Sequence, residues 1–253
     1  MDELLEKVRI WAEEKYDRKV LAVMVLGSWA SGLAKENSDY DMQVWLLPSW
    51  MDLITQKSIS RQTELPELNA DVTVKDIRLL IPLFIKQSPS ALLILNTPYI
   101  WIEKDWKFML DERWRSYDPK RCFSSSIAIA RSTLKTADRY DLNKVLSRVW
   151  MMLDLSRFLN SHHYFPKTEE LDQTGKYLKI RKGDYTDLVT LSSKSDHLTD
   201  WFDQKLKESA DSCSLSEHPK NEEFLDSFVN EFESHFRKAM TQEPVKHPKI
   251  RKP

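Results

Sequence analysis

A glycine-serine turn followed by paired aspartates lies between two apolar runs near the start of this chain, and this arrangement limits the folds that the chain can adopt. The turn, GSWASG, covers residues 27–32, and the aspartates belong to NSDYD at residues 37–41. The apolar runs, residues 20–26 and 42–47, have the length and composition of buried strands. The chain has only four glycines, and two lie in this turn, where backbone must bend sharply or approach a ligand. The pattern predicts a strand, a short helix, a turn and a second strand.

The spacing of Asp39 and Asp41 places both carboxylates on one face of the second strand, because strand side chains alternate between faces. Adjacent carboxylates repel each other unless a cation lies between them. Mg²⁺ prefers oxygen ligands and keeps open positions for phosphate oxygens. Gly27 and Ser28 begin the short helix, whose free N–H groups suit a phosphate. A phosphate-binding turn beside a metal-binding carboxylate pair predicts phosphoryl or nucleotidyl transfer.

The spacing G-S-x-A-x-G-x(5)-S-D-x-D resembles that of the nucleotidyltransferases of the DNA polymerase β superfamily. The resemblance implies that Gly27, Ser28 and Ser38 contact the triphosphate. It also implies that Asp39 and Asp41 bind two Mg²⁺ ions, for which Mn²⁺ is an acceptable substitute. A solvated Ser-Asp turn at a strand end is the simpler structural alternative, but it does not account for the attached Gly-Ser element.

A third carboxylate is expected from a neighbouring strand, because enzymes of this superfamily use one to bind metal and to help deprotonate the attacking hydroxyl. Residues 70–74, ADVTV, alternate and are β-branched, which predicts a strand. Asp71 lies near its start and is the main candidate. Asp76 competes with it but precedes an apolar helix, as an N-cap does. Glu64 and Glu67 are weaker alternatives.

Two later segments resemble a polymerase-β-like group associated with RNA repair. Residues 75–95 read as a helix, a Ser-Pro break and a second helix, and residues 180–185 read IRKGDY. The chain departs from that group at Trp29, Ser31 and Asn96, which leaves the aspartate pair intact but affects the choice of substrate. The resemblance implies that the acceptor is an RNA end.

Basic residues near the expected site are candidates for phosphate contacts. Arg131 and Lys135 are one turn apart on an expected helix and could bind the triphosphate. Arg181 and Lys182 precede Gly183 and could meet an RNA backbone, although a helix-ending turn explains the same composition. A solvated helix face is the alternative for each of these side chains.

The remaining pattern predicts an α+β chain with a mixed sheet and flanking helices, followed by a helical region. Residues 2–15 form an amphipathic helix that would pack on the sheet, and residues 48–66 are expected to form a helix and a loop. β character disappears after about residue 120. The expected division is a nucleotidyltransferase domain at 1–118, a helical domain at 119–240, and a basic, disordered tail at 241–253.

Composition narrows the setting of the activity. The net charge is −1, so a basic track for nucleic acid would have to be local. Two cysteines far apart in the sequence suit a reducing cytosol and exclude a disulfide framework. No signal peptide or membrane span is apparent, so we expect a cytoplasmic protein without membrane contact. The sequence does not indicate an oligomeric state.

These observations predict an enzyme that moves a nucleoside monophosphate from a nucleoside triphosphate to an acceptor hydroxyl, with release of pyrophosphate. An enzyme that modifies a small molecule or a protein side chain is the first alternative. A non-catalytic, antitoxin-like binding protein on the same fold is the second, and loss of a metal carboxylate would have favoured it.

Overall fold

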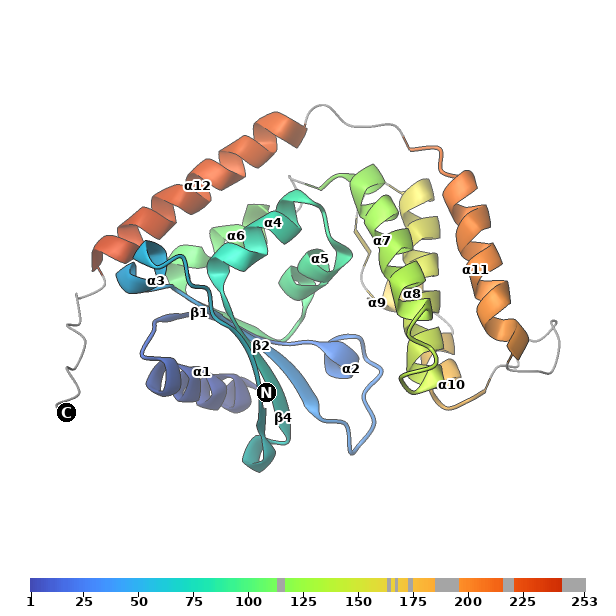
Figure 1. Cartoon of the computed structure of the whole chain (residues 1–253), viewed down its shortest axis with the longest axis horizontal. Coiled ribbons are helices and arrows are strands. Elements are labelled where there is room, and N and C mark those ends of the chain that lie inside the picture. The colour runs from blue at the N-terminus through green and yellow to red at the C-terminus, as the bar shows by residue number, and fades with distance from the viewer. Residues whose placement is uncertain are drawn as a thin grey trace.

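Five strands form one mixed sheet in the order β3-β4-β2-β1-β5 (Figure 1). The structure, a computed structural model, describes residues 1–112, 117–162, 165–166, 168–172, 175–184, 196–215 and 221–242. β2 and β4 are parallel, and every other pair of neighbours is antiparallel. The strands are β1 Val20–Val25, β2 Tyr40–Leu46, β3 Ser60–Leu65, β4 Ala70–Asp76 and β5 Ile100–Ile102. The expected α+β class with a mixed sheet is confirmed.

Helices cover both faces of the sheet (Figure 1). On one face, α1 (Asp2–Tyr16) packs its apolar stripe against alternate residues of the central strands. Met42, Val44 and Leu46 of β2 belong to this core, whereas Trp45 belongs to the core on the opposite face. This alternation places Asp39, Asp41 and Gln43 on the same face as Trp45.

The opposite face is covered by two short apolar helices, as the sequence predicts. η2 (Ile77–Leu79) and α4 (Leu80–Ile85) lead to α5 (Pro89–Asn96), and the chain turns by 120° between them. Pro89 lies at the start of α5, where the missing N–H costs nothing. The bend lets both helices contribute to one core above the sheet.

The expectation for residues 48–66 was wrong in one respect. The helix is present as α3 (Trp50–Ile54), but the segment expected to be a loop contains β3. β3 reads SRQTEL, and its side chains are mostly exposed because it is an edge strand. Pairing with β4 therefore decides its conformation, and hydrophobic alternation gives no signal for it.

The rest of the chain is helical in the described residues. Three of its helices lie side by side (Figure 1): α7 (Pro119–Leu134), α8 (Leu142–Ser161) and α11 (Asp196–Asp211). Aspartate side chains cap two of these helices. The Asp118 carboxylate accepts a hydrogen bond from the Arg121 amide of α7, and the Asp141 carboxylate accepts one from the Asn143 amide of α8. The other helices of the described residues are α2 Gly27–Ala30, η1 Pro66–Leu68, η3 Lys104–Trp106, α6 Phe108–Glu112, α9 Thr168–Leu171, α10 Lys176–Arg181 and α12 Asn221–Gln242.

The last helix, α12, returns to the sheet-containing part of the molecule and lies across α4 and α6 (Figure 1). Phe228 stacks on Phe84 with ring centroids 4.5 Å apart, and Phe232 meets Trp106 at 5.3 Å. The described core is continuous across residues 118 and 119, and the division into two domains remains a prediction. α12 includes residues 241 and 242 of the expected tail, and residues 243–253 lie outside the described residues.

Among the described helices, none is by itself long and apolar enough to cross a bilayer. The bent pair Ile77–Ile85 and Pro89–Asn96 meets that criterion by length and composition alone.

Candidate metal and nucleotide site

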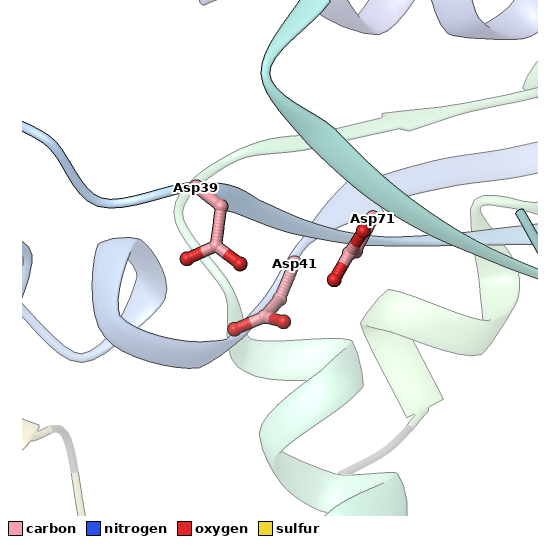
Figure 2. A group of neighbouring side chains, drawn as sticks. All are labelled: Asp39, Asp41 and Asp71. Carbon is pink, nitrogen blue, oxygen red and sulfur yellow. The ribbon is translucent and has the colours of Figure 1, made fainter. Parts of the chain in front are cut away.

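Three carboxylates meet at the end of the sheet where β2 and β4 begin, as Figure 2 shows. Asp39 directly precedes β2, Asp41 is its second residue, and Asp71 is the second residue of β4. One carboxylate oxygen from each lies within 4.8 Å of the other two. Asp39 and Asp41 are exposed, and Asp71 is half-buried.

The register of the two parallel strands creates this arrangement. Asp41 pairs directly with Asp71, and the hydrogen bond from the Tyr40 amide to the Asn69 carbonyl (2.9 Å) lies at the start of the same ladder. Directly paired residues of neighbouring strands point to the same face, so Asp71 must lie beside Asp41. The prediction that residues 70–74 are a strand is confirmed, and Asp71 is the carboxylate that this strand brings to the aspartate pair.

Gly27 lies in contact with the Asp41 carboxylate. Its φ of +60° is in the left-handed region that favours glycine, and a Cβ atom at this position would lie 2.0 Å from Asp41 Oδ2. A backbone hydrogen bond also joins the turn to β2, because the Leu26 amide donates to the Asp41 carbonyl at 2.7 Å. The turn that begins α2 is therefore packed directly against one metal-ligand candidate.

Replacing Gly27 with alanine is expected to impair the site strongly. The new methyl group would displace the Asp41 carboxylate, and the left-handed backbone adds about 1–2 kcal/mol of strain. We expect Mn²⁺ affinity to fall by tenfold or more, measured by calorimetry. The matched change is Gly32→Ala, since Gly32 also has positive φ but has no atom within 4 Å of its would-be Cβ. Equal losses in the two variants would contradict the direct contact.

The three carboxylates interact electrostatically. Burial raises the pKa of Asp41 above its ordinary value, and the neighbouring charges of Asp39 and Asp71 raise it further. Part of this carboxyl group is open to solvent, but its contact with Gly27 removes water from one side. Lys144 and Arg181 act in the opposite direction and lower the pKa of Asp41.

The three carboxylates fit a hard divalent cation. Mg²⁺ binds oxygen at about 2.1 Å, so opposite ligands of one ion are about 4 Å apart. The oxygens of Asp39, Asp41 and Asp71 are within 4.8 Å of one another, and small side-chain rotations would close this distance. The donor set contains only oxygen atoms, which is the preference of Mg²⁺ and Mn²⁺ and not that of a thiolate-binding metal.

Asp76 and Glu64, two alternatives to Asp71 as the third carboxylate, lie outside the three-carboxylate group. Asp76 is the last residue of β4, is buried, and accepts hydrogen bonds from the Arg78 amide (2.9 Å) and guanidinium (3.0 Å). The N-cap assignment for Asp76 is therefore confirmed. Glu64 pairs directly with Asp71 across β3 and β4, so it extends the acidic row toward the sheet edge. Glu64 is not part of the three-carboxylate group.

The two serines of the motif, Ser28 and Ser38, lie in the short helix α2 and in the turn before Asp39. Ser28 is buried in the four-residue helix α2, whose first N–H groups have no intrahelical partner. The Ser38 hydroxyl accepts the Lys35 amide at 2.8 Å, which closes the turn before Asp39. Contact of Gly27, Ser28 and Ser38 with a nucleotide remains a prediction.

Two of the basic candidates lie where α7 ends. Arg131 is in its last turn and is half-buried, and Lys135 is its exposed C-cap. Figure 1 shows this end of α7 next to the beginning of α8. Their contact with a triphosphate remains a prediction.

α10 brings a basic residue toward the carboxylates. Arg181 is its last residue and is close enough to Asp41 to affect that pKa, whereas Lys182 is exposed at the C-cap. Gly183 has a φ of +80° and ends the helix, as expected. Tyr185, the last residue of the IRKGDY segment, lies outside the described residues.

Two residues of this region, Lys144 and Gln43, were not predicted from the sequence. Lys144, in the first turn of α8, acts on Asp41 together with Arg181, and only the packing of α10 beside α8 brings them to the same place. Gln43 follows Asp41 on the same face of β2, is 4% exposed, and its amide nitrogen has no hydrogen-bond partner among the described residues. The strand alternation that selects Asp39 and Asp41 also selects Gln43, and it could have been found in this way.

Comparison with known proteins gives no matching family model and no similar curated protein. Among solved structures, the chain is similar to a nucleotidyltransferase-like protein from Exiguobacterium sibiricum 255-15. The identity is 12%, the alignment covers 96% of this chain and 81% of that chain, and the TM-score is 0.34. A TM-score this low carries no argument about fold or activity, so the functional argument rests on the three carboxylates.

Proposed function

We propose that this chain is a Mg²⁺-dependent nucleotidyltransferase that moves a nucleoside monophosphate from a nucleoside triphosphate to an acceptor hydroxyl. The observation that carries this proposal is that Asp39, Asp41 and Asp71 meet where β2 and β4 begin, beside the turn at Gly27 and Ser28. An acidic group alone has many explanations. Here it is combined with a glycine that a carboxylate touches and with two basic residues, Lys144 and Arg181, whose charges lower the pKa of Asp41.

The proposed reaction assigns separate tasks to the residues. The acceptor oxygen forms a bond to the α-phosphorus, the bond from that phosphorus to the bridging oxygen breaks, and pyrophosphate leaves. An Asp71 carboxylate oxygen accepts the hydroxyl proton. The triphosphate lies against the turn at Gly27 and Ser28, where helix N–H groups and the Lys144 cation offset its charge.

Asp39, Asp41 and Asp71 would hold one Mg²⁺ ion, and Asp39 and Asp41 a second, with Mn²⁺ as a substitute. The bound ions would supply charge neutralisation at the phosphates and a lower pKa for the attacking hydroxyl. Arg131 and Lys135 are proposed as further triphosphate contacts from α7.

The acceptor is proposed to be an RNA end, in a cytoplasmic setting without membrane contact. Arg181 and Lys182 would contact its backbone. Because Glu64 extends the acidic row next to Asp71, a cationic small molecule or a protein side chain is the alternative acceptor. The test is incubation with each of the four labelled nucleoside triphosphates, Mg²⁺, and a panel of RNA ends, small amines and proteins. Label transfer to an acceptor supports the proposal, and no transfer under any condition favours the non-catalytic alternative.

If the acceptor is RNA, replacing Arg181 and Lys182 together with alanine should weaken RNA binding and its salt dependence. Loss of two phosphate contacts is expected to reduce the slope of log affinity against log salt by about 1.4 for single-stranded RNA. The control is the adjacent pair Arg237 and Lys238 on α12, which has the same charge and whose two side chains are exposed, as Lys182 is. RNA binding that is negligible, or equally weakened in both double variants, would favour the small-molecule acceptor.

A further inference from the structure

The carbonyl group of Ser38 accepts hydrogen bonds from two side chains that come from different elements. Trp29 Nε1 of α2 donates to it at 3.2 Å, and Asn69 Nδ2 donates to it at 3.3 Å. This carbonyl belongs to the peptide that joins Ser38 to Asp39. The two donors therefore hold the backbone immediately before one of the three site carboxylates.

The backbone immediately after Asp39 is held as well. The Tyr40 amide donates to the Asn69 carbonyl at 2.9 Å, so Asn69 contacts the chain on both sides of Asp39. Asn69 itself lies two residues before Asp71 and adopts the left-handed conformation, with φ of 48° and ψ of 46°. One residue thus links the backbone positions of Asp39 and Asp71.

Trp29 makes a second contact with the same segment. Its ring stacks on Tyr40, with centroids 4.7 Å apart and planes inclined by 19°. Trp29 also belongs to α2, the helix whose first residue touches Asp41. Through Trp29 and Asn69, the backbone on both sides of Asp39 is tied to the elements that contact the other two carboxylates.

We propose that Trp29 and Asn69 are positioning residues for metal binding, which fix the place of Asp39 relative to Asp41 and Asp71. This inference rests on the proposed function, because it requires that the three carboxylates bind a divalent cation. The physical reason is that Asp39 precedes the strand, and its own backbone forms no ladder hydrogen bond with the described part of the chain. Groups that orient metal ligands typically change metal affinity by about 10- to 100-fold when they are removed.

Two variants remove the donors while they preserve the rest of the local structure. Trp29→Phe deletes the indole N–H but keeps an aromatic ring to stack on Tyr40. Asn69→Gly deletes the amide donor, tolerates the left-handed backbone and keeps the carbonyl that binds the Tyr40 amide. The controls are Trp50→Phe, which also removes an indole bond of 3.2 Å to a carbonyl, and Gln56→Gly, which also has a positive φ of 54°.

The readouts are Mn²⁺ affinity by calorimetry and the melting temperature of the metal-free protein. We expect the double variant Trp29→Phe/Asn69→Gly to bind Mn²⁺ about 10- to 100-fold more weakly than wild type. We expect its metal-free melting temperature to match that of the double control Trp50→Phe/Gln56→Gly, which should keep wild-type Mn²⁺ affinity.

Wild-type Mn²⁺ affinity in the site double variant would overturn the inference and leave the proposed function intact. A loss of affinity that the control double variant shares, or that follows a lower melting temperature, would also overturn it. If the double variant fails to fold, the two single variants decide between the same outcomes. Failure of the wild type to bind Mn²⁺ would overturn both the inference and the proposed function.

Discussion

Replacing Asp41 with asparagine is expected to lower nucleotide transfer by about a thousandfold or more, while the protein remains folded. The amide keeps the size of the carboxylate but loses the charge that would hold the cation, which corresponds to at least about 4 kcal/mol of transition-state stabilisation. The measurement is the single-turnover rate at saturating Mg²⁺. Asp203→Asn on α11 is the control, because it removes a partly exposed carboxylate that pairs with Lys207 and lies outside the three-carboxylate group.

The stability of the same variant tests the electrostatics independently. Because the pKa of Asp41 is raised in the fold, its contribution to stability is complete below the unfolded pKa of about 3.9. That contribution is lost as the pH rises through the folded pKa. In metal-free protein at pH 7, Asp41→Asn should therefore be at least as stable as wild type, with the difference shrinking toward pH 3. A near wild-type transfer rate, or a marked loss of stability at pH 7, would contradict the assignment.

Asp71→Asn is expected to lower turnover by about 10²- to 10⁴-fold, because it removes both a metal ligand and the proposed proton acceptor. Its effect on triphosphate binding should be modest, since the Asp39 and Asp41 pair and the basic residues remain. The measurements are the rate at saturating nucleotide and the nucleotide affinity of the metal-loaded protein.

Asp76→Asn is the comparison that identifies the third carboxylate. Asparagine keeps the N-cap but loses the charge that pairs with Arg78, so we expect about 1–3 kcal/mol of lost stability and an unchanged turnover of the folded protein. A strong loss of turnover in Asp76→Asn, with near-normal turnover in Asp71→Asn, would assign the third carboxylate to Asp76.

Two local patterns predict the three carboxylates of this site from the sequence. The alternation of strand side chains places Asp39 and Asp41 together, and the strand pattern of residues 70–74 selects Asp71. Neither pattern predicts that the two strands, β2 and β4, are neighbours in the sheet. Their proximity depends on the parallel register that pairs Asp41 with Asp71, which is a tertiary property.

Apart from Gln43, the features that the sequence patterns did not predict have no local signal in the sequence. β3 is a polar edge strand, and only its hydrogen bonds to β4 define it. Lys144 resembles any exposed lysine near a helix start, and the packing of α8 and α10 determines that it acts on Asp41. The bonds from Trp29 and Asn69 to the Ser38 carbonyl join residues up to 31 positions apart, which no periodicity could indicate.

The most direct measurement is a crystal structure with Mn²⁺ and a non-hydrolysable nucleoside triphosphate, using the anomalous signal of manganese. We expect a manganese peak among the carboxylates of Asp39, Asp41 and Asp71, with the triphosphate against the turn at Gly27 and Ser28. A manganese peak elsewhere, with these three carboxylates turned away from it and the triphosphate distant from Gly27, would contradict the proposed metal and nucleotide site.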